Sequence, residues 1–183
     1  MDTQSAILTA LYHRLPDEAA RLVRLAQSLT VWEAAALGLD DAVEAALSQR
    51  PGDVNAFAPD GHTPLGLAAF FARPSTVRLL LVRGADVTAA ARNPMQVQPL
   101  HAAVAGRSAE VVELLLAHGP DVNARQQVGY TPLMGAAASG REDLVQLLLR
   151  HGADRSLVAE DGHTAAAVAR EHGHAALATA LSA

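Results

Sequence analysis

Short apolar segments alternate with turn residues along most of this chain. The stretch 131–152 is representative: it has a Thr-Pro pair, an apolar segment as far as Ala138, and a second apolar segment that ends in three leucines before a glycine. Thr followed by Pro signals the start of a helix, and a glycine directly after a helical segment signals its end. The pattern therefore predicts a compact pair of short helices.

This helix pair recurs with a period near 33 residues. Thr63, Thr131 and Thr164 stand 68 and 33 residues apart, and Gln98-Pro99 occupies the position of the missing middle copy. The glycines that close the second helices follow the same step, at Gly84, Gly119 and Gly152. A period of this length predicts a solenoid of stacked helix pairs.

At these residues the chain resembles the ankyrin repeat family, whose repeat reads roughly D-x-x-G-x-T-P-L-H-x-A-A and then V-x-x-L-L-x-x-G-A-D-V-N. Three copies match closely, at about 56–88, 89–124 and 125–156, and two match loosely, at 31–55 and 157–183. The resemblance implies an all-α solenoid of antiparallel helix pairs joined by β-hairpin loops. Residues 1–30 read as a degenerate N-terminal capping pair, and we expect one continuous domain.

Local signals predict where several helices begin. Thr63 and Thr131 are suited to cap helices, with Pro64 and Pro132 at the first helical position. The loop 91–98 of the middle copy lacks a turn glycine and is two residues longer than its counterparts. We interpret this loop either as a recognition element or as a neutral insertion.

Composition excludes several classes of function. The 183 residues are 50% hydrophobic, largely alanine and leucine, with only 3% aromatic residues, as suits helices packed closely through small side chains. The net charge is −5 and no basic run is interleaved with aromatics, so we expect no nucleic-acid partner. The absence of cysteine excludes disulfides and thiolate metal sites.

The expected location is the cytoplasm. No segment approaches the roughly 20 apolar residues of a membrane helix, and the apolar segment 6–11 is too short for a signal peptide. We therefore expect no membrane association. All 14 basic residues are arginine, which we interpret as a sign of a G+C-rich, bacterial coding background.

The eight histidines of the chain are candidate metal ligands. His118 and His151 fall at one position of successive repeats, and His172 and His174 stand close in sequence. Without a nearby carboxylate set these pairs complete no four-ligand site, so we expect no metal and no cofactor. His101 matches the family histidine that bonds backbone in the adjoining loop. The chain has no nucleophile elbow and no phosphate loop, and we expect no enzyme.

The partner surface follows from the resemblance. In the ankyrin family it is the concave face, built from the loop tips and the exposed ends of the first helices. Carried onto this sequence, the predicted partner-binding residues are Tyr12, Leu37, His62, Phe70, Phe71, Met95, Gln96, Val97, Ala105, Gln127, Val128, Tyr130, Ser139, His163 and Arg170.

Aromatic residues are concentrated in this set. Four of the six in the chain belong to it, namely Tyr12, Phe70, Phe71 and Tyr130. A solenoid needs no aromatics there, whereas exposed aromatics are typical of interface hot spots. The alternative is that Phe70 or Phe71 folds inward and covers the alanine-rich first helices.

The function expected from the sequence is binding of another protein. The chain would act as a non-catalytic, monomeric adaptor or regulator through its concave face. One alternative is an accessory or inhibitory subunit of one specific enzyme. Another is a protein that handles a small ligand or a metal through its histidines.

Overall fold

The computed structural model describes residues 5–182, and within this range the chain forms twelve α-helices, two short 3-10 helices and no β-strand. The α-helices are α1 (Ala6–Tyr12), α2 (Pro16–Leu25), α3 (Val31–Leu37), α4 (Asp40–Gln49), α5 (Pro64–Phe70), α6 (Pro74–Val82), α7 (Pro99–Ala105), α8 (Ala109–Leu116), α9 (Pro132–Ala138), α10 (Glu142–Arg150), α11 (Ala165–Glu171) and α12 (Ala175–Ser182). The 3-10 helices are η1 (Pro51–Asn55) and η2 (Gln127–Gly129).

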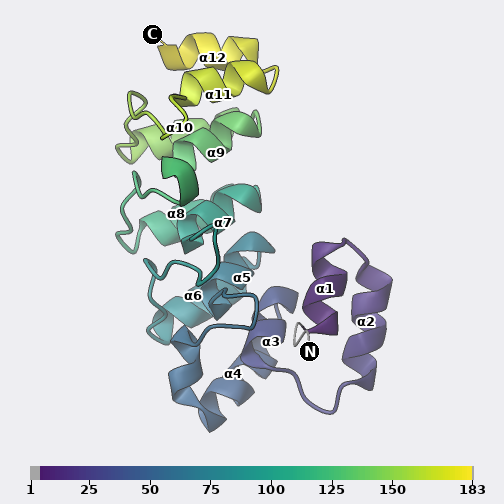
Figure 1. The fold of residues 1–183 in the computed structure, drawn as a ribbon. Helices are drawn as coiled ribbons and strands as arrows, with labels where there is room; N and C mark the ends of the chain where they lie inside the picture. The colour runs from purple at the N-terminus through teal and green to yellow at the C-terminus, as the bar shows by residue number, and fades with distance from the viewer. Residues whose placement is uncertain (1–4, 183) are drawn as a thin grey trace.

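From α3 onward the helices stack in two rows (Figure 1). The inner row contains α3, α5, α7, α9 and α11, and each of these helices contacts the next. The outer row contains α4, α6, α8 and α10, which also contact in sequence. This arrangement confirms the predicted all-α solenoid of helix pairs.

The inner helices begin where the sequence predicts. Thr63 accepts a hydrogen bond from the backbone N–H of Gly66, and Thr131 accepts one from Met134. A proline follows each of these caps at the first helical position, where its missing N–H costs nothing. In the middle repeat Gln98 occupies the cap position and its side chain caps nothing.

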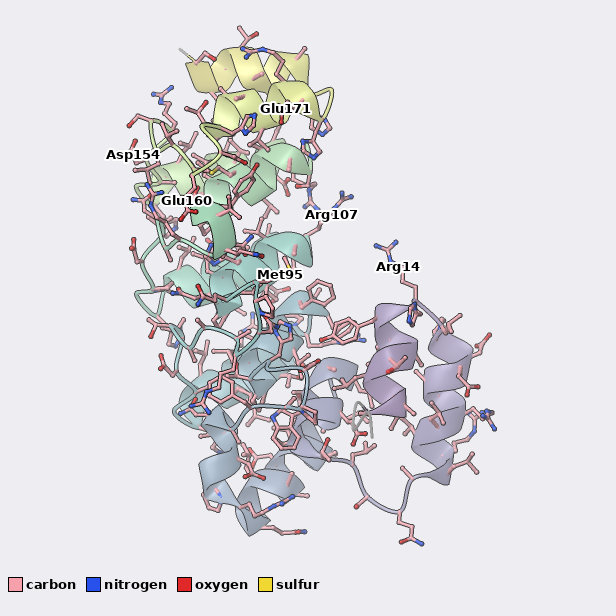
Figure 2. The ribbon with its side chains drawn as sticks, in the orientation of Figure 1. Arg14, Met95, Arg107, Asp154, Glu160 and Glu171 are labelled. Atoms are coloured by element: carbon pink, nitrogen blue, oxygen red, sulfur yellow. The ribbon has the colours of Figure 1, made fainter. Side chains whose placement is uncertain are left out.

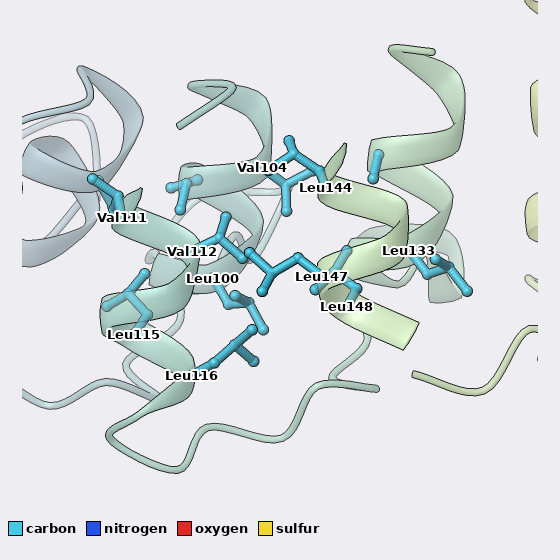
Figure 3. Packing of buried hydrophobic residues seen from close by; sticks show 14 of the residues in the cluster. Leu100, Val104, Val111, Val112, Leu115, Leu116, Leu133, Leu144, Leu147 and Leu148 are labelled. Carbon is cyan, nitrogen blue, oxygen red and sulfur yellow. The ribbon is translucent and has the colours of Figure 1, made fainter. Parts of the chain in front are cut away.

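The core follows from the sizes of the side chains. The inner helices meet through pairs of alanines that are fully buried, as at Ala68-Ala69 and Ala136-Ala137. Leucines and valines fill the wider space between inner and outer helices. Figure 3 shows this packing in the middle of the solenoid, where Leu115, Leu144 and Leu148 are completely buried.

The loops between successive helix pairs, here called fingers, are tight turns and not two-stranded ladders. Three of them are closed by a backbone hydrogen bond between residues four apart, for example from Ala58 N–H to His62 O at 2.8 Å. The finger of the middle copy is closed from Ala91 N–H to Val97 O at 2.9 Å. Its closing bond spans six residues, which confirms the predicted two-residue lengthening.

Backbone hydrogen bonds also join one fingertip to the next. Gln127 N–H donates to Met95 O at 3.1 Å, and Glu160 N–H donates to Val128 O at 2.9 Å. The tips therefore form a connected row along one edge of the inner face. Such links fix the fingers relative to one another.

The N-terminal helix pair lies beside the first two repeats and does not extend their row (Figure 1). Leu8 of α1 is 2% exposed and packs with Ala36, Ala58 and Leu67, so α1 covers the inner side of α3 and α5. Trp32 is half-buried against the same cluster, and its ring N–H donates to Ala56 O at 3.0 Å. The segment interpreted from the sequence as a cap is residues 1–30, and its helices α1 and α2 thus form a side wall of the inner face.

Candidate partner-binding groove

A hollow of about 350 Å³ opens on the inner face next to this side wall. We call it the groove. Small residues of α7 and α9 form its floor, including Ala102, Ala105 and Gly135. Tyr12 and Phe70 line its N-terminal end. Seven of the fifteen predicted partner-binding residues line it, namely Tyr12, His62, Phe70, Met95, Val97, Ala105 and Ser139.

An aromatic cluster forms the N-terminal end of the groove. The ring of Tyr12 lies 5.8 Å from that of Phe70 and 5.3 Å from that of Phe71, and the two phenylalanines meet edge to face at 5.0 Å. The hydroxyl of Tyr12 donates to Asp60 at 2.9 Å. Burial and the nearby Asp60 carboxylate raise the pKa of Tyr12 well above its usual value, so the phenol stays protonated and keeps its donor.

The contacts of Phe70 and Phe71 combine features of both interpretations of the aromatics. Phe70 and Phe71 pack on Tyr12 of the N-terminal pair, and Phe71 also packs against the buried cluster that contains Ala36 and Leu67. Phe70 remains 37% exposed. The cluster therefore serves as a wall of the groove and still presents an aromatic surface to it.

The finger side of the groove is set by His62, Met95 and Val97. Met95 is 53% exposed, and a methionine side chain adapts readily to an apolar surface. His62 is half-buried with its Nε2 3.3 Å from the side-chain nitrogen of Asn93, and burial lowers the pKa of His62. This side of the groove therefore carries a neutral imidazole beside flexible apolar side chains.

His101 lies at the base of the groove and is 5% exposed. Its Nε2–H donates to the backbone O of Tyr130 at 3.3 Å, which confirms the role expected from the sequence. Its Nδ1 has no hydrogen-bond partner within the described chain. Burial lowers the pKa of His101 to about 4, so the ring is neutral at physiological pH.

The other eight predicted residues lie outside the groove. Gln96, Gln127 and Val128 are exposed on fingertips, and Arg170 is exposed on α11. Leu37 is half-buried at the end of α3, and Phe71 is half-buried in the aromatic cluster. None of these six residues lines the groove itself.

Tyr130 and His163 meet at the C-terminal end of the finger row, around Asp161. His163 places its Nδ1 3.0 Å from Asp161 and its Nε2 2.8 Å from Glu171. The hydrogen bond with Asp161 and the charge of Glu171 raise the pKa of His163. Burial and the nearby Asp161 carboxylate raise the pKa of the Tyr130 phenol. This cluster is polar and negatively charged, unlike the groove.

Several groove residues were not predicted from the sequence. Val104, Gln126 and Gly135 line it from α7, the third finger and α9, and Arg107 reaches it from the turn after α7. Gly106 at that turn lies so close to α5 that an added Cβ would stand 2.4 Å from the backbone O of Phe70. The sequence holds no signal for this close approach, since it depends on how the repeats stack.

Among residues 5–182, no group of three or more metal-binding side chains comes together. Over that range no helix has the length and apolar character needed to cross a membrane.

The fold and its groove define a repeat solenoid with a preformed surface on its inner side. A sequence model of the family described as "Ankyrin repeats (3 copies)" matches residues 31–126 and 100–183. This chain therefore belongs to the ankyrin repeat family, whose members are generally protein–protein interaction modules.

Two Homo sapiens proteins illustrate the relationship. The chain is 38% identical to Rabankyrin-5 over 76 residues, which is 40% of this chain and 6% of that protein. It is 46% identical to neurogenic locus notch homolog protein 4 over 72 residues, which is 39% of this chain and 4% of that protein. The chain thus matches only a small part of each relative's length, and the similarity concerns the repeats.

Proposed function

We propose that this chain binds another protein through the groove and acts as a non-catalytic adaptor or regulator. The observation that carries the proposal is a mainly apolar hollow whose walls are held by contacts within the chain itself. We expect it to act as a monomer in the cytoplasm.

Rigidity supports this proposal. The tip-to-tip hydrogen bonds and the Tyr12–Asp60 bond hold the groove in shape without a partner. Less conformational entropy is then lost on association, so more of the contact energy appears as affinity. Aromatic residues in such a position carry a large share of binding energy, and Phe70 is the best placed of them.

An accessory or inhibitory subunit of one enzyme would be a narrower case of the same function. It would use the same groove, with the partner being one enzyme. The identity of the captured protein distinguishes the two cases.

The test blocks the groove without changing charge. Ala105 is exposed and lines the groove floor, so Ala105→Tyr fills the hollow while leaving the core intact. Ala117→Tyr is the matched control, because Ala117 is exposed at the end of α8 in the outer row. Both variants should unfold at the wild-type temperature.

Affinity capture with quantitative mass spectrometry then compares the three proteins. We expect at least one captured protein to fall by about 10-fold or more with Ala105→Tyr and to persist with Ala117→Tyr. A set of captured proteins that is the same for all three baits would count against the groove as the binding surface.

A further inference from the structure

A second hollow of about 670 Å³ adjoins the groove at the end of the inner helices. We call it the arginine cleft. It lies between the α1–α2 turn, which carries Arg14, and the α7–α8 turn, which carries Arg107. Figure 2 shows these two arginines on facing sides of the gap between the N-terminal pair and the solenoid. Tyr12, Phe70 and Arg107 line both hollows, so the two are continuous.

The base of the arginine cleft is apolar. Leu11 contributes from α1, and Phe70 and Phe71 contribute from the end of α5. The cleft therefore combines an aromatic base with a guanidinium group on each side.

The charge of this surface is opposite to that of the protein. The chain has a net charge of −5, yet the residues that line the groove and the cleft include no aspartate or glutamate. Five other arginines, Arg21, Arg50, Arg78, Arg83 and Arg141, form salt bridges with carboxylates of the chain. Within residues 5–182 neither Arg14 nor Arg107 forms such a salt bridge. Two guanidiniums are thus left for a partner's acidic groups.

The backbone at these arginines adds a second observation. Arg14 and Arg107 have φ of 56° and 58°, in the left-handed region that glycine prefers. The equivalent turns after α9 and α11 use Gly140 and Gly173. An arginine at such a turn costs stability relative to glycine, so the turn itself does not require this side chain.

We infer that the arginine cleft and the adjoining groove bind an acidic segment of a partner protein, in which carboxylates flank a bulky apolar residue. The inference rests on the proposed function and specifies the chemistry of the partner. The carboxylates pair with Arg14 and Arg107, since guanidinium and carboxylate form paired hydrogen bonds. The apolar residue packs on Phe70 and Phe71.

A protein segment fits this surface better than a nucleic acid. Nucleic-acid affinity depends on many phosphate contacts, whereas the cleft offers two arginines on an acidic protein.

The experiment selects binders from a displayed library of random 16-residue peptides on the full chain. The expected peptides carry Asp or Glu next to Leu, Phe, Tyr or Trp. A labelled 16-nucleotide oligo(dT) serves as the nucleic-acid probe. Affinities are measured by fluorescence anisotropy at low and high NaCl, and affinity for the peptides should fall with salt.

The decisive variant is Arg14→Gly/Arg107→Gly. We expect it to lower peptide affinity about 100-fold and to leave the unfolding temperature unchanged or raised, because glycine is favoured at both turns. The matched control is Arg150→Gln/Arg155→Gln, which makes the same change of charge at exposed positions outside both hollows. It should change peptide affinity less than about twofold.

Other outcomes separate the two hypotheses. In one outcome, Ala105→Tyr abolishes binding of the selected peptides, but these peptides lack acidic residues and bind Arg14→Gly/Arg107→Gly with wild-type affinity. This outcome would overturn the role inferred for the arginine cleft and leave the proposed function standing. If Ala105→Tyr leaves the affinity of the selected peptides unchanged, or if the selection yields no binder, both the role of the arginine cleft and the proposed function of the groove would be overturned. If oligo(dT) binds the wild-type chain as tightly as the peptides do, and Arg14→Gly/Arg107→Gly weakens that binding, the inference that the ligand is a protein segment would be overturned.

Discussion

The hydroxyl of Tyr12 donates a 2.9 Å hydrogen bond to the carboxylate of Asp60, which ties the end of α1 to the tip of the first finger. Asp60 also accepts the backbone N–H of His62 at 3.1 Å. One carboxylate therefore holds both the turn of its own finger and the N-terminal helix pair. Because Tyr12 forms an end of the groove, this bond links the position of α1 to the shape of the binding surface.

Removing the Tyr12 hydroxyl tests this link. We expect Tyr12→Phe to lower the free energy of unfolding by about 1.5–3 kcal/mol, the range for a hydrogen bond to a charged group. The measurement is urea denaturation of Tyr12→Phe, Asp60→Asn and the double variant. A coupling of at least about 0.5 kcal/mol is expected between the two sites. Simple additivity would mean that the bond contributes nothing.

The docking of α1 on α3 and α5 depends on Leu8. We expect Leu8→Ala to lower the free energy of unfolding by about 3 kcal/mol, because the side chain is 2% exposed against Ala36, Ala58 and Leu67. Leu25→Ala is the control, since Leu25 is 68% exposed, and should cost less than about 0.5 kcal/mol. Equally small effects in urea denaturation would contradict the side-wall position of the N-terminal pair.

The uncapped helix α7 offers a stabilising substitution. Gln98 makes no side-chain cap, whereas Thr63 and Thr131 cap the equivalent helices. We expect Gln98→Thr to raise the free energy of unfolding by about 1 kcal/mol. The reverse change at an equivalent position, Thr63→Gln, should lower it by a similar amount. Thermal unfolding of both variants checks the pair, and a destabilised Gln98→Thr would show that Gln98 has another role.

Stability should fall in mild acid because of His101. Its folded pKa is about 4, against about 6.5 in an unfolded chain. Between these values the unfolded chain binds the proton and the folded protein does not, so the free energy of unfolding decreases as pH decreases. The full difference amounts to about 3 kcal/mol at and below pH 4.

The measurement is urea denaturation of wild type and His101→Gln at pH 7, 5.5 and 4.5. Burial also lowers the pKa of His62, which acts in the same direction and remains in the variant. We therefore expect a shallower but not flat pH dependence for His101→Gln. If the free energy of unfolding depends on pH equally in wild type and His101→Gln, the pKa of His101 in the folded protein is close to that in the unfolded chain.

About half of the predicted binding residues line the groove. The prediction used only each residue's position within its repeat. Ala105 and Ser139 lie at the ends of regular inner helices, where a position in the repeat fixes a position on the inner face. Met95 and Val97 lie on the lengthened finger that borders the same face. Tyr130 and His163 also belong to repeats, but they lie toward the C-terminal end, where Asp161 and Glu171 gather them into a separate polar cluster. Repeat position alone does not show which part of a long face is hollow.

The sequence by itself determined the solenoid. Its period, the caps at Thr63 and Thr131, and the extra length of the middle finger all depend on short-range chemistry, in which each residue acts on neighbours a few positions away. Such signals are complete in the printed sequence, and the helix boundaries and the finger turns follow them.

Only the tertiary structure decided where the N-terminal pair lies. Contact between Tyr12 and Phe70 joins residues 58 positions apart, and no local pattern encodes it. The placement results from burying Leu8 and the aromatic rings together on α3 and α5. The same long-range packing brings Arg14 and Arg107 to one cleft, because side chains that are distant in sequence become neighbours only when the apolar surfaces between them are buried.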